Sequence, residues 1–146
     1  MTVRPLLASD EAAWRPLWQG YCAFYGEMLD EAVTRHLWQA LLDPARSPHG
    51  RVLEREGRLV GFSHYVLHPT TWTLTDACYL EDLYVDPADR GQRLGKALID
   101  DLLGLARTHE WARLYWHTRS GNAAARRLYD HYVAADDFVR YRIAVD

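Results

Sequence analysis

Residues 81–98 read EDLYVDPADRGQRLGKAL, and this stretch predicts a β-strand that runs through a short loop into a helix. The strand, expected at Tyr79 to Val85, ends at Asp86-Pro87, because proline cannot donate a backbone hydrogen bond. Apolar residues recur at helical spacing from Leu94 to Thr108. The first N–H groups of such a helix lack partners and carry partial positive charge. With the glycines and cations of the loop they predict a site for a phosphate group.

Two other phosphate-binding motifs fail on spacing in this loop. A Walker loop requires GxxxxGK followed by serine or threonine, but Gly91 and Gly95 are one residue too close and alanine follows Lys96. The dinucleotide fingerprint GxGxxG does not occur in the sequence. A structural alternative stays open, in which Gly91 caps a turn and the cations Arg90 and Arg93 belong to a solvated helix face.

The remaining pattern predicts an α/β domain with a mixed sheet. Apolar spacing after Trp14 predicts a helix, in which Pro16 either makes a kink or marks the first turn. A second helix is expected from about Asp30 to Leu42, and a hairpin around the turn Glu56-Gly57. Further strands are expected at residues 2–6, 51–54, 58–67, 113–117 and 138–145, and a helix at residues 122–131.

Composition limits the function classes. The 146 residues, 49% hydrophobic and 25% charged, suit one globular domain spanning 1–146. No apolar run reaches the ~20 residues of a membrane helix and no signal peptide is seen, so a cytoplasmic protein without membrane contact is expected. The net charge of −3 argues against a nucleic-acid partner. No metal is expected, because Cys22 and Cys78 lack metal spacing and His64 and His68 lack a third ligand.

Two motifs and the order of elements resemble the GNAT superfamily of acyl-CoA-dependent N-acetyltransferases. Residues 90–95, RGQRLG, resemble its R/Q-x-x-G-x-G/A signature, and residues 122–129, NAAARRLY, resemble its N-x-x-A-x-x-L-Y helix. The resemblance covers nearly the whole chain and implies a mostly antiparallel central sheet flanked by about four helices. Residues 80–86, LEDLYVD, look like the branch that includes diamine, polyamine and histone-type acetyltransferases.

The sequence departs from the family pattern at two places. The family often has a glycine where Arg93 stands, so the loop is bulkier here. The usual L-Y-x-x-x-G-F becomes a longer stretch from Leu128 to Phe138 without its glycine. That change puts the expected link to the last strand in question.

The resemblance implies acetyl-CoA as co-substrate and a primary amine of a small molecule, polyamine or protein as acceptor. The pyrophosphate would lie on the N–H groups of the loop. The pantetheine arm would run along the strand as an added strand, and one strand N–H would polarise the acetyl carbonyl. The implied cofactor-binding residues are Leu83, Tyr84, Val85, Arg90, Gly91, Gln92, Arg93, Leu94, Gly95, Lys96, Asn122 and Tyr129.

The resemblance also implies two catalytic residues. Tyr129 would protonate the CoA sulfur, although it could instead be a core aromatic of its helix. Glu81 would act as general base, directly or through water. Because neighbouring strand residues alternate, only one of Glu81 and Asp82 is expected to face the substrate, and the alternative is a solvent-facing or arginine-paired carboxylate. His117 could contact the acceptor.

Other readings stay open at this stage. The acidic residues Glu27, Asp30 and Glu31 could attract a cationic amine, but such a cluster more often caps a helix. The proteins that the sequence resembles are often homodimers. The rival function is a catalytically silent acyl-CoA-binding module with a sensing role; a retained Tyr129 favours catalysis.

Overall fold

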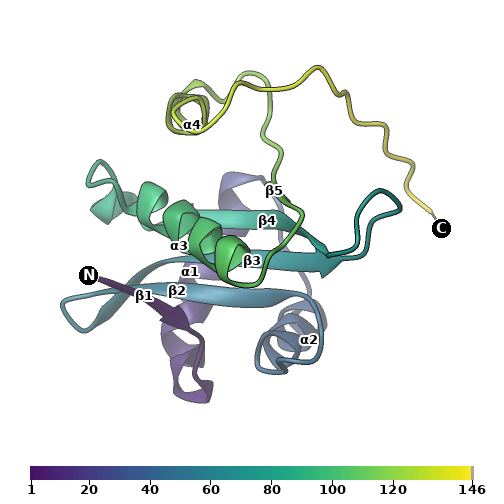
Figure 1. The fold of residues 1–146 in the computed structure, drawn as a ribbon. Coiled ribbons are helices and arrows are strands. Elements are labelled where there is room, and N and C mark those ends of the chain that lie inside the picture. Colours follow the sequence, from purple (N-terminus) through teal and green to yellow (C-terminus); the bar gives the residue numbers. More distant parts are fainter. Residues whose placement is uncertain (146) are drawn as a thin grey trace.

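The computed structural model describes residues 1–145, which form a five-stranded sheet and four α-helices (Figure 1). The elements are β1 (Thr2–Pro5), α1 (Glu11–Phe24), α2 (Glu31–Leu41), β2 (His49–Arg55), β3 (Arg58–His68), β4 (Ala77–Val85), α3 (Leu94–Thr108), β5 (Arg113–Tyr115) and α4 (Ala123–Tyr129). The strands lie in the order β1-β2-β3-β4-β5. Three neighbouring pairs are antiparallel and only β4–β5 is parallel, which confirms the expected α/β fold with a mostly antiparallel sheet.

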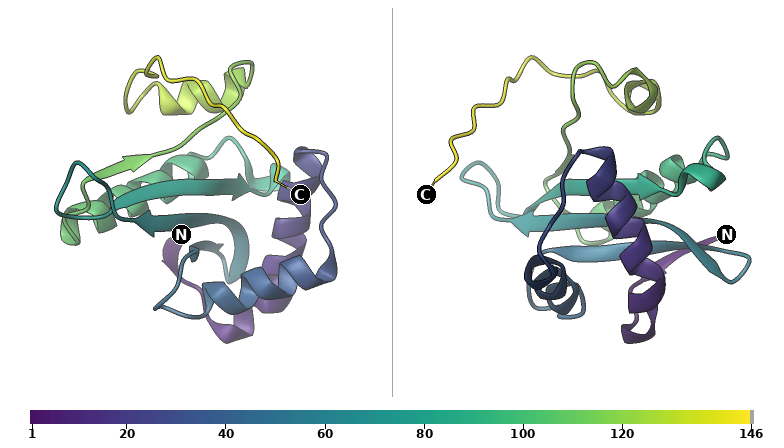
Figure 2. Two further views of the ribbon diagram at one scale, coloured as in Figure 1. Left: turned by 90° about the vertical axis from the view of Figure 1, so that its right-hand side faces the viewer. Right: turned by 180° about the vertical axis from the view of Figure 1, so that it is seen from behind.

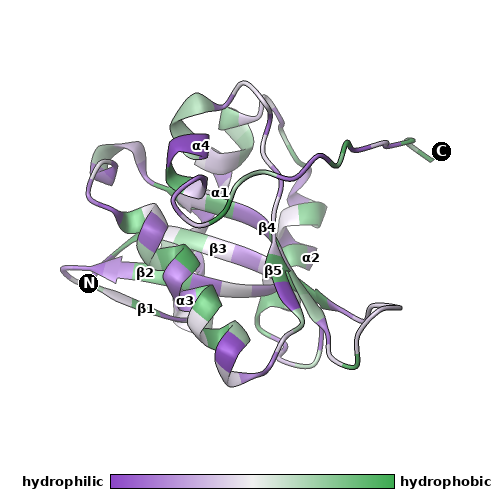
Figure 3. Ribbon diagram, turned by 45° about the horizontal axis from the view of Figure 1, so that its top comes forward, coloured by the Kyte–Doolittle hydropathy of each residue, from purple (hydrophilic) through white to green (hydrophobic). Residues whose placement is uncertain are grey.

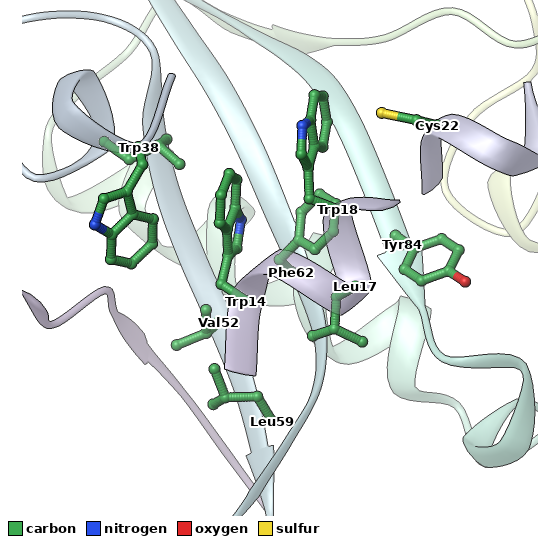
Figure 4. Packing of buried hydrophobic residues seen from close by; sticks show 10 residues of the cluster. Trp14, Leu17, Trp18, Cys22, Trp38, Val52, Leu59, Phe62 and Tyr84 are labelled. Atoms are coloured by element: carbon green, nitrogen blue, oxygen red, sulfur yellow. The ribbon is translucent and has the colours of Figure 1, made fainter. Parts of the chain in front are cut away.

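An aromatic core joins α1 and α2 to one face of the sheet (Figures 2 and 4). Trp14 and Trp18, one helical turn apart on α1, stack with ring centroids 5.9 Å apart. Trp38 of α2 packs against Trp14 at 5.0 Å, and Phe62 of β3 lies beneath them. Burial of such large rings is the main stabilising contribution on this face.

Helix α3 covers the opposite face of the sheet. Its fully buried residues Leu98, Ile99 and Leu102 recur at helical spacing, as the sequence pattern predicts. On the same helix Asp101 accepts two hydrogen bonds of 2.8 Å from the guanidinium group of Arg51 on β2. This bidentate pair fixes the helix against the strand.

Most predicted elements are found within a few residues of their expected ends. The turn of the β2–β3 hairpin forms as expected, with positive φ at both Glu56 and Gly57. Helix α1 begins at Glu11, so Pro16 lies inside it and does not mark its first turn. Because proline has no N–H, the helix lacks one backbone hydrogen bond there.

The predicted closing strand at residues 138–145 is wrong: this segment is extended but pairs with no strand among the described residues. After Tyr129 the chain makes one more turn, with the Val133 N–H bonded to the Tyr129 carbonyl, and then runs away from the sheet (Figures 1 and 2). The longer link without the family glycine does not return the chain to β5. Strand β5 itself is shorter than predicted and ends at Tyr115.

Candidate active site

The loop between β4 and α3 is held by two carboxylates. The side chain of Asp86 accepts a hydrogen bond from the Ala88 N–H at 3.0 Å, and the buried Asp89 binds the guanidinium of Arg58 at 3.1 Å. Beyond them Gly91 has a φ of +85° and Arg93 a φ of +61°. The left-handed conformation suits glycine and costs other residues about 1 kcal/mol. Arg93 therefore adopts a left-handed conformation at the position where the family often has a glycine, the residue that this conformation suits.

The N-terminus of α3 leaves a row of free hydrogen-bond donors. Arg93 is its N-cap and makes no side-chain cap. Within residues 1–145, no acceptor binds the N–H groups of residues 91–96. These groups and the helix dipole favour a phosphate at this point. The nearby cations are engaged: Lys96 pairs with Asp100 at 2.6 Å, and Arg90 donates to the Val85 carbonyl at 3.0 Å.

The edge of β4 that faces β5 is open along its second half. Pairing with β5 ends at Tyr79, opposite Tyr115. The Asp86 N–H donates to Val60 of β3, and hydrogen-bonding groups alternate along an antiparallel strand. The N–H and C=O groups of Leu83 and Val85 therefore point to the open side. Such an edge can bind an extended, amide-bearing ligand as an added strand.

The predicted strand residues differ in what they present to this edge. The side chains of Leu83 and Val85 pack toward α3, so only their backbone is available. Tyr84 is buried on the α1 side, and its ring lies against Gly20 of α1. A Cβ added at Gly20 would clash with the Tyr84 hydroxyl. The backbone of Tyr84 faces β3 by the same alternation.

A β-bulge interrupts β4 at Glu81. His64 of β3 is opposite Asp82, whereas its neighbour Tyr65 is opposite Leu80, so Glu81 is the extra residue. Regular alternation along the strand was the reason to expect only one of Glu81 and Asp82 to face the substrate. The bulge interrupts that alternation, so strand geometry no longer separates the two carboxylates. Burial raises the pKa of Glu81, and the adjacent carboxylate of Asp82 raises it further. The two acids are thus electrostatically coupled at one point of the strand.

A buried histidine fixes the second carboxylate of the bulge. Nδ1 of His64 lies 2.9 Å from Oδ2 of Asp82. The indole N–H of Trp14 donates to Nε2 of the same ring at 3.2 Å, so Nδ1 carries the proton that binds Asp82. His64 is 1% exposed. Its spacing in the sequence gives no sign that it orients a site carboxylate.

Helix α4 lies across the start of α3 (Figure 1). Asn122 caps α4, accepting a hydrogen bond from the Ala125 N–H at 3.4 Å. A Cβ at Gly95 would lie 3.1 Å from Leu128, so glycine allows this close approach. Tyr129 packs edge-to-face on Trp116, with centroids 5.4 Å apart. Burial raises the pKa of Tyr129 to about 12, so the phenol keeps its proton at neutral pH.

An open cleft of about 270 Å³ lies beside α4, lined by Phe24, Tyr25, Arg119, Gly121 and Asn122. The cleft brings the end of α1 next to the cap of α4. A larger hollow of about 400 Å³ lies between β1, α1 and the β2–β3 hairpin, and it contains no predicted site residue. The smaller cleft is therefore the one that adjoins the predicted chemistry.

Other sequence candidates are accounted for by local contacts. His117 lies beyond β5, where its Nδ1 is 3.1 Å from the Tyr79 hydroxyl. Glu31 forms an ion pair with Arg15 at 2.9 Å, which favours its structural role. The residues that the structure describes include no cluster of three potential metal ligands and no helix able to span a membrane.

A family model described as the acetyltransferase (GNAT) family matches residues 13–132 of the chain. The chain belongs to this family. It is 28% identical to the D-amino-acid N-acetyltransferase HPA3 of Saccharomyces cerevisiae, over 97% of this chain and 89% of the relative. It is 30% identical to the uncharacterized N-acetyltransferase YjgM of Escherichia coli, over 88% of this chain and 78% of the relative.

A solved structure of similar fold is the ribosomal-protein-alanine N-acetyltransferase of Brucella melitensis biovar Abortus 2308. The TM-score is 0.82 at 27% identity, with 99% of this chain and 100% of the other covered. The protein is therefore an acetyltransferase, and GNAT acetyltransferases use acetyl-CoA.

In this GNAT acetyltransferase, three features escaped prediction from the sequence: the bulge at Glu81, the His64–Asp82 pair, and the cleft residues Phe24 and Arg119. The consecutive acids Glu81-Asp82 are the one signal in the sequence that marks the bulge region.

Proposed function

We propose that this acetyltransferase transfers the acetyl group of acetyl-CoA to a primary amine, by direct attack in a ternary complex, and acts as a single domain over residues 1–146. One observation carries the proposal: free backbone donors at the start of α3 adjoin the open edge of β4. The first feature suits a pyrophosphate and the second suits the amide-bearing pantetheine arm. Few other metabolites combine these two chemistries in one extended molecule.

The residues present fit this co-substrate. The N–H groups from Gly91 to Lys96 would bind the pyrophosphate, with Arg93 adding charge beside it. Leu83 and Val85 would bind the arm through backbone groups. Acetyl-CoA supplies its acetyl group as a thioester, whose carbonyl carbon the amine attacks. One N–H of the β4 edge would polarise that carbonyl.

Two side chains would move the protons of the reaction. Glu81, directly or through water, would take a proton from the amine as the C–N bond forms, and its raised pKa makes it a stronger base than an ordinary carboxylate. Tyr129 would give its proton to sulfur as the C–S bond breaks, so that CoA leaves as a thiol. A phenol that is protonated at neutral pH is suited to this role.

The acceptor side favours a cationic amine. Glu81 and Asp82 put two carboxylates at the bulge. The aromatic side chains of Tyr21 on α1 and of Tyr25 just after that helix add faces that attract cations. This supports acceptors such as polyamines and basic protein amines, as in the diamine, polyamine and histone-type branch. The D-amino-acid and ribosomal-protein activities of the relatives add α-amino groups to the classes that deserve testing.

The proposal is tested by measuring the release of thiol from acetyl-CoA in the presence of each of a panel of candidate acceptors. The panel contains polyamines, D- and L-amino acids, aminoglycosides and alanine-terminated basic peptides. Turnover with one class would support acetyl transfer and define the acceptor. Binding of acetyl-CoA by calorimetry without turnover would favour the silent module. Absence of binding would contradict the placement of the pyrophosphate at α3.

A further inference from the structure

Hydrogen bonds through His64 connect the aromatic core to the bulge of β4. The indole N–H of Trp14 donates to Nε2 of His64 at 3.2 Å, and Nδ1 of the same ring lies 2.9 Å from Oδ2 of Asp82. Trp14 is fully buried and the His64 side chain is 1% exposed, whereas the Asp82 side chain is 14% exposed. The network therefore runs from the closed interior to a carboxylate at its accessible end.

The ring of His64 is enclosed on several sides. It stacks on Phe62 with ring centroids 4.4 Å apart, and the rings of Trp14 and Trp18 lie at 5.9 and 5.3 Å. Figure 4 shows Trp14, Trp18 and Phe62 close together between α1 and the sheet. On the side of β2, a Cβ added at Gly50 would lie 3.6 Å from the imidazole. A ring packed in this way keeps one orientation, so it directs its Nδ1 proton to one place only.

The middle of the sheet contains polar groups that its packing does not require. Figure 3 shows hydrophilic residues within the central strands, between stretches of hydrophobic ones. A buried imidazole needs partners for both of its nitrogens, and an apolar residue of similar size would fill the space without that need. Here each hydrogen bond orients the next group: Trp14 fixes the tautomer of His64, and the tautomer fixes Asp82.

The carboxylate of Asp82 adjoins α1 and the side on which the smaller cleft opens. Burial raises the pKa of Tyr21 on α1, and the nearby charge of Asp82 raises it further, so the phenol stays protonated beside the carboxylate. Tyr25, which lines the cleft, packs on Tyr21 with ring centroids 4.9 Å apart. Of the two acids at the bulge, Asp82 is bonded to the His64 ring, whereas Glu81 is bonded to no donor within residues 1–145. One carboxylate is thus fixed and the other is free to move.

We propose that His64 is a positioning residue of the acceptor site, which fixes Asp82 as the carboxylate that binds the cationic acceptor and leaves proton transfer to Glu81. A carboxylate that is already oriented binds a cation without the entropy cost of ordering its own side chain. Binding of the acceptor is therefore the step that depends on His64. This assignment rests on the proposed function, because it divides the acceptor chemistry between the two acids of the bulge.

Two amide variants separate the two hydrogen bonds of the ring. In His64→Asn the amide N–H takes the place of Nδ1 and can still donate to Asp82, whereas in His64→Gln the amide takes the place of Nε2 and serves Trp14. With the acceptor that the panel identifies, His64→Gln is expected to raise the acceptor KM about tenfold, with kcat and the KM of acetyl-CoA little changed. His64→Asn is expected to restore the acceptor KM to within about twofold of the native value.

The outcomes of this comparison separate the two proposals. A structural role alone would lower kcat in both variants and leave the acceptor KM unmoved, and that result would overturn the role of His64. Native turnover with equal acceptor KM in the native chain and both variants would do the same and leave the proposed function standing. A native chain that acetylates no amine would remove the proposed function, and the role of His64 with it.

A double-mutant cycle shows whether His64 acts through Asp82. Asp82→Asn is expected to raise the acceptor KM at least about tenfold. Adding His64→Gln to that variant is expected to raise the KM no further, because the ring then has no carboxylate to fix. If the two effects multiplied, His64 would act on another group, and the proposal would be overturned.

A spectroscopic test remains informative if the variants of His64 do not fold. Nitrogen NMR of the native chain with labelled histidine is expected to place the His64 proton on Nδ1. Replacing Trp14 by β-(3-benzothienyl)alanine, which keeps the indole shape but has sulfur in place of the N–H, is expected to abolish this single tautomer and to raise the acceptor KM. The same replacement at Trp18 is the matched control, because the Trp18 N–H has no acceptor within residues 1–145. A native ring protonated on Nε2, or equal responses at the two tryptophans, would overturn the proposal.

Discussion

At the scale of single residues, Tyr129 permits a direct test of the proposed proton donor. Tyr129→Phe is expected to lower kcat by about 100-fold with little change in the affinity for acetyl-CoA, because only the transferable proton is lost. Steady-state kinetics and calorimetry together check this result. A nearby phenol supplies the control: the hydroxyl of Tyr132 donates to Asp100 at 2.6 Å, so Tyr132→Phe is expected to keep kcat. An unchanged kcat in Tyr129→Phe would remove the phenol from the mechanism.

Glu81 is tested by the pH dependence of the rate. The pKa of this carboxyl is raised above its usual 4.5, so the native kcat/KM is expected to fall as pH drops through that raised value and the base becomes protonated. Glu81→Gln is expected to show no such fall of kcat/KM in acid and to be slow at neutral pH. Its activity should recover as pH rises, because the amine then deprotonates without help.

The control for this experiment is Glu27→Gln, which removes an exposed acid at the end of α1. It is expected to leave the shape of the pH profile unchanged. A loss in Glu81→Gln that is the same at every pH would assign the residue a structural role.

At the scale of elements, helix α3 contains a matched pair of glycines. A Cβ at Gly95 would lie 3.1 Å from Leu128 of α4, whereas a Cβ at Gly104 meets nothing within 4 Å. Gly95→Val is expected to weaken CoA binding at least tenfold by calorimetry, since the side chain crowds the free N–H groups and displaces α4. Gly104→Ala on the same helix is expected to leave binding unchanged and to stabilise the fold by about 1 kcal/mol. Equal affinity in Gly95→Val would contradict the pyrophosphate placement.

The junction of β1 and α1 depends on one buried carboxylate. Asp10 accepts hydrogen bonds from Arg4 at 2.8 and 3.0 Å and from the Leu7 N–H at 2.7 Å. The Arg4 hydrogen bonds hold the pKa of Asp10 below its usual 3.8. Asp10→Asn is expected to lower the free energy of unfolding by about 2 kcal/mol at neutral pH, because Arg4 loses one of its two charged partners and keeps only Glu54.

The sign of the pH effect follows from the lowered pKa of Asp10. The stabilising contribution is complete above pH 3.8, where the unfolded carboxyl is ionised, and is lost as pH falls through the lower folded value. The native protein and Asp10→Asn should therefore converge in stability below about pH 3.8, as measured by urea unfolding. The exposed Asp130→Asn serves as the control and is expected to change little. If the difference in stability between the native protein and Asp10→Asn were as large in acid as at neutral pH, the result would contradict a stabilising ion pair between Arg4 and Asp10.

At the scale of the whole molecule, local patterns predicted the elements whose partners lie on the same chain. The period of Leu98 and Leu102 defined α3, and the turn at Glu56-Gly57 defined a hairpin. Residues 138–145 have an equally clear strand pattern, but a strand also needs a neighbour, and within residues 1–145 no strand pairs with this segment. Periodicity reports which face a segment would bury, not which surface will cover it.

Prediction of the site was limited for a similar reason. The donors at the start of α3 follow from the local sequence, because any helix begins with free N–H groups. The open edge of β4 and the contact between His64 and Asp82 depend on pairing between strands. A single extra residue in β4 decides both which carboxylates come together and where the pattern of side chains changes.

The bulge at Glu81 gives β4 one residue more than its pairing with β3 requires. Leu80 and Leu83 both pack toward α3, although three positions apart they would lie on opposite faces of a regular strand. Deleting Glu81 would leave Leu80 and Leu83 two positions apart and on the same face, with the pairing to β3 unchanged on both sides. Such a deletion is expected to remove the carboxylate and to keep the rest of the strand in place. Deleting any other residue of β4 would instead turn part of the strand to the wrong face.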